Sequence, residues 1–328
     1  MIVLACKCGS TEGLKRRELT VFTPGFVGNM RFDQLPRSNQ VEDRRGDSPR
    51  GFPLGRAGGV GVGTLLLLTA ISWALGINPI YLIGGAELLS NLRGQQQTQP
   101  APSAGTPGSD RTAEFVSAVL GSTEVTWTDI FAQSGRRYEP PTLVMFSGST
   151  PSACGYAQAA MGPFYCPNDR KVYLDTSFFD DLARRFHGCD LGSKSCQFAQ
   201  AYVITHEIGH HVQNLLGILP QVQEAQQALG QADSNQLQVR VELQADCFAG
   251  VWGHYAAEKW GVIEPGDVEA AVQTASAIGD DRLQRRTQGY VVPDAFTHGS
   301  SEQRTRWFTT GLRSGQVASC DTFRANPL

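Results

Sequence analysis

The stretch "ITHEIGHHVQN" (Ile204–Asn214) decides how the surrounding domain folds and what it can bind. His206 and His210 are four residues apart, so both imidazoles project from one face if the stretch is helical. Such a pair can bind one Zn²⁺ through ring nitrogens. Glu207 can then reach the open side of the metal and take a proton from its water. The stretch therefore predicts a helix that binds a catalytic zinc ion, rather than a helix with two solvated histidines.

A catalytic zinc needs a third protein ligand, and "VELQADCFAG" (Val241–Gly250) supplies candidates. Glu242 and Asp246 are again four residues apart, among apolar neighbours that make unpaired carboxylates costly. One carboxylate can bind the metal while the other accepts a hydrogen bond from a ligand histidine. His211 is interpreted as a residue that supports the metal ligands or as structural, and His254 as structural. The expected content is one Zn²⁺ per domain.

Bulk composition excludes one function class. The 328 residues are 41% hydrophobic and 18% charged, with a formal net charge of −3. No broad basic excess is present to neutralise phosphates, so nucleic acid is not an expected partner.

Residues 110–328 are expected to form one α+β domain, mainly helical with a small β-sheet. The strand-like runs are "PTLVMFSG" and "KVYLD". Apolar periodicity, capping residues and terminal glycines predict the helices. They are expected at 176–188, 198–216, 235–260 and 300–311, with two short ones ending at Gly121 and Gly135.

The N-terminal third contains a long uncharged segment. Residues 57–86 carry no charge, and about 20 apolar residues span a bilayer. We expect a single transmembrane helix at 57–78, ended by Pro79. Arginines are concentrated before it, which predicts a cytoplasmic N-terminus and a domain outside the cytoplasmic (inner) membrane.

The remaining boundaries follow from composition. Residues 1–29 are expected to be an N-terminal extension that is not translated in the cell, with Met30 as the true start. Residues 30–56 form the basic cytoplasmic segment. Residues 79–109 are rich in Gln, Pro and Ser and are expected to be a flexible tether.

Six cysteines in the domain are candidates for disulfides outside the cytoplasm. Cys154 with Cys166 and Cys189 with Cys196 flank short, glycine-bearing loops, so two local bridges are expected. Cys247 then remains to join Cys320, although an inert buried thiol at Cys247 is an alternative.

Several motifs together resemble one known family. They are "MRFDQLPRS", "GPFYCPNDRKVYLDTSFF", "THEIGHHVQ", "ELQADCFAGVW" and "THGSSEQRTRWFTTG". Over about Met30 to Phe323 the chain resembles the putative neutral zinc metallopeptidase family of bacterial membrane proteins, which is similar to gluzincins.

The resemblance implies a zincin-like fold and a role for each site residue. The zinc ligands would be His206, His210 and Glu242, with Glu207 as the general base and Asp246 holding a ligand histidine. Thr297, His298 and Arg304 look like a late T/S-H-P…R element, with Gly299 in place of Pro. We take His298 as the candidate donor to the reacting oxyanion, with a structural histidine in a helix-capping loop as the alternative. Arg304 is taken as a second donor or a partner of a site carboxylate.

The predicted function is hydrolysis of peptide bonds by a membrane-anchored zinc metallopeptidase, with a peptide or protein substrate. The membrane lipid would be contacted through the single transmembrane helix. Two alternatives remain open: a non-catalytic zinc scaffold, and a zinc hydrolase that acts on a non-peptide amide or ester. The sequence carries no signal for an oligomeric state.

Overall fold

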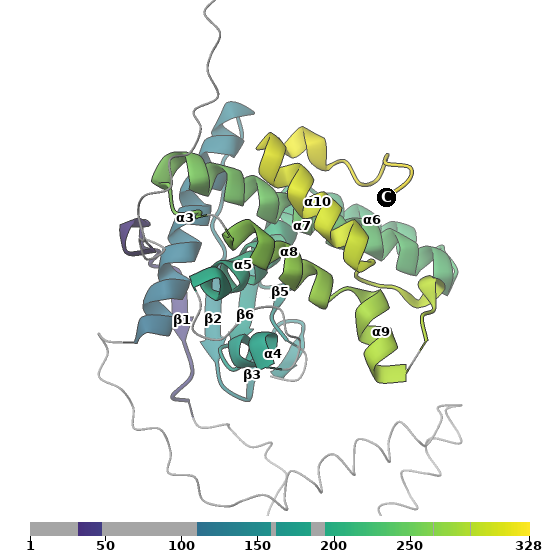
Figure 1. Ribbon diagram of the computed structural model, residues 1–328, viewed down its shortest axis with the longest axis horizontal. Coiled ribbons are helices and arrows are strands. Elements are labelled where there is room, and N and C mark those ends of the chain that lie inside the picture. The colour runs from purple at the N-terminus through teal and green to yellow at the C-terminus, as the bar shows by residue number, and fades with distance from the viewer. Residues whose placement is uncertain (1–31, 48–109, 159–161, 185–193, 265, 289) are drawn as a thin grey trace, which may run out of the picture.

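Helix α5 (Lys194–Leu215) is the element around which the other helices pack. It contacts α3 (Arg111–Gln133), α7 (Gln231–Trp260) and α8 (Asp267–Ala277), and it also contacts strand β5 (Phe164–Cys166). In Figure 1 the sheet lies on one side of α5, and α7, α8 and α10 lie on the other. This computed structural model describes residues 32–47, 110–158, 162–184, 194–264, 266–288 and 290–328.

The other elements are short apart from α10. The strands are β1 (Val41–Asp43), β2 (Thr142–Phe146), β3 (Ser149–Ser152), β4 (Gly155–Gln158) and β6 (Lys171–Asp175). The helices are α4 (Phe178–Arg184), α6 (Ile218–Gln226), α9 (Asp280–Gln288) and α10 (Ser301–Ser314). The 3₁₀ turns are η1 (Phe32–Gln34), η3 (Pro293–Ala295) and η4 (Val317–Cys320).

The main sheet has the order β1-β2-β6-β5, with β5 antiparallel to β6 and the other pairs parallel. Leu143 pairs with Val172, and both belong to the main core that faces the helices. Val144 and Tyr173 point to the opposite face, where the β3–β4 hairpin contributes to a smaller buried cluster. Both faces are therefore buried, which is why the strands read as apolar runs.

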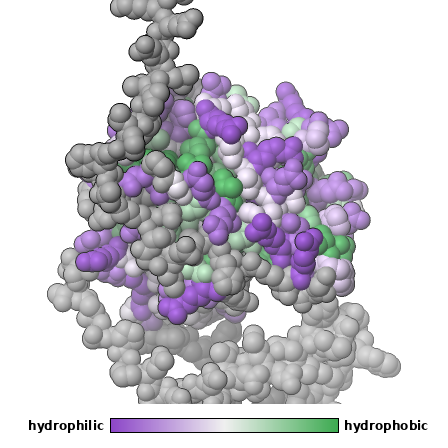
Figure 2. All heavy atoms as spheres, in the orientation of Figure 1, coloured by the Kyte–Doolittle hydropathy of each residue, from purple (hydrophilic) through white to green (hydrophobic). Residues whose placement is uncertain are grey.

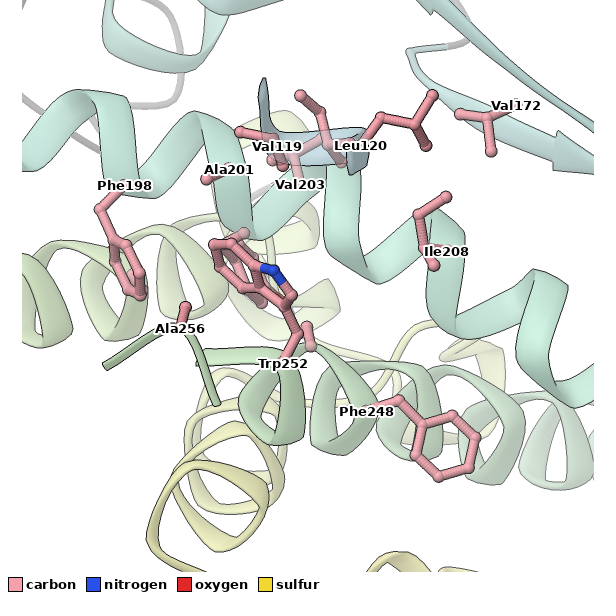
Figure 3. Packing of buried hydrophobic residues seen from close by; sticks show 14 of the residues in the cluster. Val119, Leu120, Val172, Phe198, Ala201, Val203, Ile208, Phe248, Trp252 and Ala256 are labelled. Atoms are coloured by element: carbon pink, nitrogen blue, oxygen red, sulfur yellow. The ribbon is translucent and has the colours of Figure 1, made fainter. Parts of the chain in front are cut away.

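Aromatic side chains fill the core between α3, α5 and α7 (Figure 3). Trp252 of α7 stacks on Phe198 of α5, with ring centroids 6.0 Å apart. Its indole Nε1 donates a hydrogen bond to Ser122 Oγ of α3 at 2.9 Å. The three helices are thus joined by apolar contact and by a satisfied buried polar group.

Helix α3 runs unbroken where two shorter helices were expected. Gly121 lies in its middle, and a Cβ there would collide with the carbonyl of Pro36. The glycine permits close approach of the 36–37 backbone and does not end the helix. The prediction of a helix end at Gly121 was therefore wrong. Gly135, with φ +69°, does follow the helix end.

The N-terminal segment 32–47 is part of the domain. Strand β1 pairs with β2, and Phe32 and Leu35 are buried in the main core. Arg45 forms ion pairs with Asp43 and with Asp110, the N-cap of α3. This differs from the expected division, which placed residues 30–56 apart from residues 110–328. The strand escaped notice because it has three residues and one apolar side chain.

The α+β class, mainly helical with small sheets, is confirmed. Strands β2 and β6, the long helices α5 and α7 and the capping box of α10 follow the predicted pattern. The expected transmembrane helix at 57–78 and the tether at 79–109 lie outside the described residues. Within the described ranges, no helix is long and apolar enough to cross a membrane. The coloured residues in Figure 2 are mostly hydrophilic on the face shown.

Candidate metal centre

Small residues allow α5 and α7 to cross closely beside the H-E-x-x-H motif. A Cβ on Gly209 of α5 would lie 2.9 Å from the carbonyl oxygen of Ala245 and 3.0 Å from its Cα. Any larger residue would push the helices apart. Glycine at this position therefore brings Glu242 and Asp246 of α7 within reach of the α5 histidines.

Three side chains converge at this crossing. Glu242 Oε2 lies 3.2 Å from His206 Nε2 and 3.5 Å from His210 Nε2. One ligand atom from each residue fits within a mutual separation of 4.8 Å. Tetrahedral zinc with bonds of about 2.0–2.1 Å requires donors about 3.3 Å apart. The donor set and its spacing therefore fit Zn²⁺.

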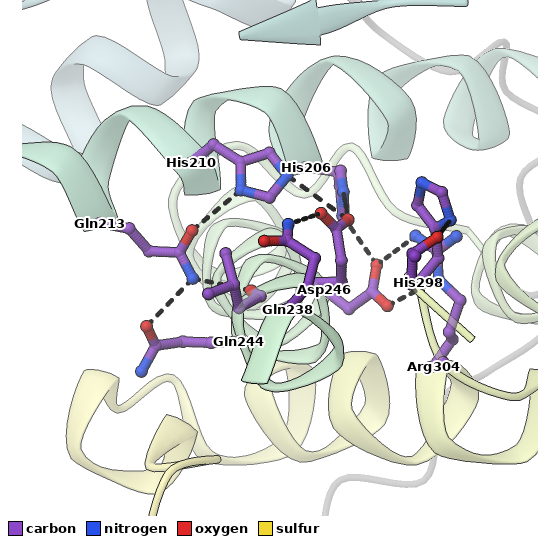
Figure 4. Close-up of polar contacts among 12 residues, drawn as sticks. His206, His210, Gln213, Gln238, Gln244, Asp246, His298 and Arg304 are labelled. Carbon is purple, nitrogen blue, oxygen red and sulfur yellow. Dashed lines mark hydrogen bonds and ion pairs between the residues drawn. The ribbon is translucent and has the colours of Figure 1, made fainter. Parts of the chain in front are cut away.

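The outer nitrogens and oxygens of the same three residues are all occupied by partners (Figure 4). His206 Nδ1 lies 2.8 Å from Asp246 Oδ1, and His210 Nδ1 lies 2.9 Å from Gln213 Oε1. Gln238 Nε2 donates to Glu242 Oε1 at 3.0 Å. These contacts leave both Nε2 atoms and one carboxylate oxygen facing a common point.

Asp246 is held by a buried guanidinium and does not join the donor set. Arg304 makes a two-pronged contact, from Nε to Oδ2 and from an Nη to Oδ1, both at 2.9 Å. Tyr202 donates its hydroxyl to Oδ1 at 2.5 Å. Burial raises the pKa of Asp246, but Arg304 and His206 outweigh it and lower that pKa to about 2. Arg304 thus serves as the partner of a site carboxylate.

The electrostatic environment of the crossing favours positive charge. Burial lowers the pKa of His206, but Asp246 and Glu242 outweigh it and raise that pKa to about 10. Burial raises the pKa of Glu242, but His210 and His206 hold it well below its usual range. A cation between these groups is therefore stabilised, in agreement with a metal site.

Glu207 differs from the other two carboxylates. Its side chain is buried and lines the same cavity as His206 and His210. Among the described residues, none donates a hydrogen bond to the Glu207 carboxylate, whereas Glu242 and Asp246 both have donors. Glu207 is thus the carboxylate available to a reacting molecule.

The cavity has a volume of about 600 Å³ and opens beside the donor set. Its wall is mostly apolar, with glutamines and the site residues as the polar part. The larger apolar side chains are Phe164, Phe178, Leu219, Val222, Ile278 and Leu283. Arg304 lies in the wall but is paired with Asp246. A wall of this composition accommodates the apolar parts of a ligand and offers it a few polar contacts.

His298 lies in the wall of the same cavity, on the loop before α10. Its Nδ1 is 3.2 Å from Asp280 Oδ1, and its side chain is 51% exposed. The hydrogen bond to Asp280 raises the pKa of His298. Gly299, which follows it, has φ +94°, a conformation that proline cannot adopt. The loop therefore requires glycine where the resembling element has proline.

The two remaining histidines of the helices lie away from the donor set. His211 is buried, with Nε2 2.7 Å from the carbonyl oxygen of Glu139 and Nδ1 3.0 Å from the hydroxyl of Tyr165. Burial lowers the pKa of His211 to about 4. His254 Nδ1 lies 2.9 Å from the carbonyl oxygen of Leu312. Both link the helices to their neighbours.

Two disulfides join described residues as expected. Cys154 is bonded to Cys166, and Cys247 of α7 is bonded to Cys320. The alternative of an inert thiol at Cys247 is therefore wrong. Cys196 is also disulfide-bonded, and its expected partner Cys189 lies outside the described residues.

Sequence reasoning missed three residues around the donor set. Gln213 contacts His210, Gln238 contacts Glu242, and Asp280 accepts backbone N–H groups of Thr297 and His298 at 2.6 Å. Gln213 carried a usable signal, because it is three residues after His210 on a helix whose neighbours are apolar. Asp280 carried none, since 18 residues separate it from His298.

Two histidines of an H-E-x-x-H helix and the glutamate of an E-x-x-x-D helix thus form one candidate metal site. The sequence profile of the putative neutral zinc metallopeptidase family matches residues 30–323, and the chain belongs to this family. It is 47% identical over 299 residues to uncharacterized protein YpfJ of Escherichia coli K12, covering 90% of this chain and 99% of that protein. It is 46% identical over 200 residues to uncharacterized protein Rv2575 of Mycobacterium tuberculosis H37Rv, covering 58% and 65%. No solved structure matches the chain.

Proposed function

We propose that the chain is a zinc-dependent peptidase that uses Glu207 as its general base. The observation that carries this proposal is the position of the Glu207 carboxylate. It lies in the cavity wall, next to the ligand histidines and without a hydrogen-bond donor among the described residues. A purely structural zinc site has four protein ligands, whereas the described residues offer three here, which would leave one position for water.

The roles of the residues follow from their positions. His206, His210 and Glu242 would hold the zinc, which when bound activates water and polarises a carbonyl group. Glu207 accepts a proton from the attacking water and returns it to the leaving amine nitrogen. Asp280 accepts from His298 Nδ1 and raises the pKa of that ring, and the protonated ring would donate from Nε2 to the developing oxyanion.

The substrate we propose is a peptide or protein segment bound in extended form. The apolar wall of the cavity would receive uncharged side chains beside the scissile bond, and the glutamines at its edge would bind backbone amides. No free cation of the described wall is available to bind an acidic side chain, because Arg304 is paired with Asp246 and His298 with Asp280.

Glu207→Gln should abolish peptide hydrolysis by the purified full chain while zinc remains bound, because the amide cannot accept the proton. General-base catalysis contributes about 10²–10⁴-fold to rates. Release of peptides from a mixed proteome digest measures the reaction, and elemental analysis measures the zinc. Gln227→Ala, on the exposed end of α6, is the matched control and should leave hydrolysis unchanged.

Other outcomes of the same experiment separate the alternatives. Unchanged hydrolysis in Glu207→Gln would contradict the proposed base. A chain that holds zinc but releases no peptides, before or after the substitution, would favour the scaffold. Hydrolysis of esters or wall-derived amides without peptide release would favour the non-peptide hydrolase.

We further propose that the domain works outside the cytoplasm, attached to the cytoplasmic membrane. Disulfides persist in oxidising compartments, and this domain contains at least two. The uncharged segment 57–86 supports a membrane contact.

The pairing of β1 with β2 changes the orientation we propose for the N-terminus. A single crossing between residues 47 and 110 would put these paired strands on opposite sides of the membrane. Arg44 and Arg45, two of the arginines that suggested a cytoplasmic N-terminus, have partners within the fold. We therefore place residues 32–47 on the same side as residues 110–328.

Epitope tags before Met30 and after Leu328 should be on the same, outer side of the membrane in a bacterial host. External protease should remove both tags from intact spheroplasts, and a cytoplasmic protein should stay protected as the control. Protection of the N-terminal tag alone would refute the shared side. Protection of both tags would refute the outer location and leave the strand pairing intact.

A further inference from the structure

A line of buried hydrogen bonds leads from His210 away from the cavity (Figure 4). His210 Nδ1 lies 2.9 Å from Gln213 Oε1, and Gln213 Nε2 lies 3.1 Å from Gln244 Oε1. Gln244 Nε2 lies 2.9 Å from the carbonyl oxygen of Cys320. Gln213 Nε2 also lies 2.7 Å from the carbonyl oxygen of Val241. The two glutamines are 0% and 6% exposed, so water does not supply substitutes.

The Cys320 carbonyl, at the end of this line, fixes which group donates and which accepts in every hydrogen bond along it. A backbone carbonyl only accepts, so Gln244 must present its amide nitrogen to Cys320 and its oxygen to Gln213. Gln213 must then donate with Nε2, toward both Gln244 and Val241, and accept with Oε1. The remaining donor is His210 Nδ1–H. The lone pair of that ring is consequently on Nε2, the atom nearest Glu242.

We propose that Gln213 is a positioning residue that fixes the metal-binding tautomer of His210. Gln244 and the Cys320 carbonyl hold Gln213 in the required orientation, and the Cys247–Cys320 disulfide holds Cys320 against α7. The proposal rests on zinc binding by His210, as in the proposed function, but not on hydrolysis. It gives the two glutamines and the disulfide a shared role in zinc affinity.

The affinity of the purified full chain for zinc, measured by competition with a chelating indicator, tests the role of Gln213. Gln213→Ala should weaken zinc binding about 10–100-fold, as removal of a hydrogen-bond partner of a ligand typically does. Gln213→Glu should bind zinc more tightly than Gln213→Ala, because a carboxylate still accepts from Nδ1–H. A merely structural role predicts the reverse order, since a buried charge beside Val241 and Gln244 destabilises the fold.

The tautomer itself provides a readout that does not depend on those variants folding equally well. Nitrogen NMR of the histidine-labelled wild-type chain, with zinc bound, should show His210 protonated at Nδ1. Protonation at Nε2 would overturn the proposal. If Gln213→Ala keeps full zinc affinity and His210→Ala loses it, the positioning role of Gln213 is refuted and the metal site stands. Full affinity in both variants would instead remove the metal-site assignment.

The disulfide is tested with paired cysteine substitutions. Cys247→Ser with Cys320→Ser should weaken zinc binding, because the Cys320 carbonyl is then less firmly held. Cys154→Ser with Cys166→Ser removes a different disulfide, which is far from α7 in the sequence, and should leave zinc affinity unchanged. Equal affinities in the two double variants would exclude the disulfide from this role.

Discussion

His206→Ala and His210→Ala should each reduce the zinc content of the purified full chain from one ion to nearly none. Each substitution removes one of three protein donors that lie within 4.8 Å of one another. The two remaining donors cannot complete a tetrahedral protein site. Elemental analysis after dialysis against a weak chelator measures the loss. Glu242→Ala should have a comparable effect, because the Glu242 carboxylate is the third candidate ligand and lies close to both histidines.

Two further variants test whether the loss is specific to the donor set. Asp246→Asn keeps the three ligands but weakens the partner of His206 and the contact with Arg304, so zinc affinity should fall about 10–100-fold without disappearing. His254→Gln changes a histidine outside the donor set and should leave one ion bound. Full zinc content in both His206→Ala and His210→Ala would refute the metal centre.

Arg304→Met should destabilise the fold by about 3–5 kcal/mol, the usual cost of breaking a buried ion pair by removing one partner. Arg304 and Asp246 are 3% and 0% exposed, so the carboxylate would be left buried without its counter-charge. Urea unfolding of the zinc-free chain measures the change in the free energy of unfolding. Arg324→Met is the matched control. That side chain is 91% exposed, and its loss should change stability by less than about 0.5 kcal/mol.

The same pair makes a prediction about pH. The pKa of Asp246 in the fold, about 2, is below its unfolded value of about 3.9. Its ionised form therefore contributes stability above about pH 4, and that stability is lost as the pH falls toward 2. Arg304→Met should flatten this acid dependence. An unchanged acid profile together with unchanged stability would contradict the role of the pair.

The sequence predicted the centre of the site better than its surroundings. The i, i+4 spacings on α5 and α7 place His206, His210, Glu242 and Asp246 on facing sides of two helices, and the structure brings them together. Spacing carries this information because helix geometry is regular. Gln213 and Gln238 lie three residues after His210 and four residues before Glu242, but spacing alone did not single them out, since glutamine is common on exposed helix faces.

Tertiary contacts account for the other differences. Gly121 resembles a helix terminator in the sequence, but a backbone approach from residues 36–37 requires it. Strand β1 has no alternating pattern, and its partner β2 lies about 100 residues further along the chain. Local sequence patterns do not encode such distant pairings.

Strand β1 also has a practical consequence for how the domain is prepared. A chain trimmed to begin at Asp110 would leave one edge of β2 with unpaired backbone N–H and C=O groups. It would also uncover the core surface that Phe32 and Leu35 fill. Exposed edges with apolar surroundings recruit strands from other molecules and lead to aggregation. A monodisperse preparation of the protein should therefore retain residues 32–47, joined to the domain or supplied as a separate peptide.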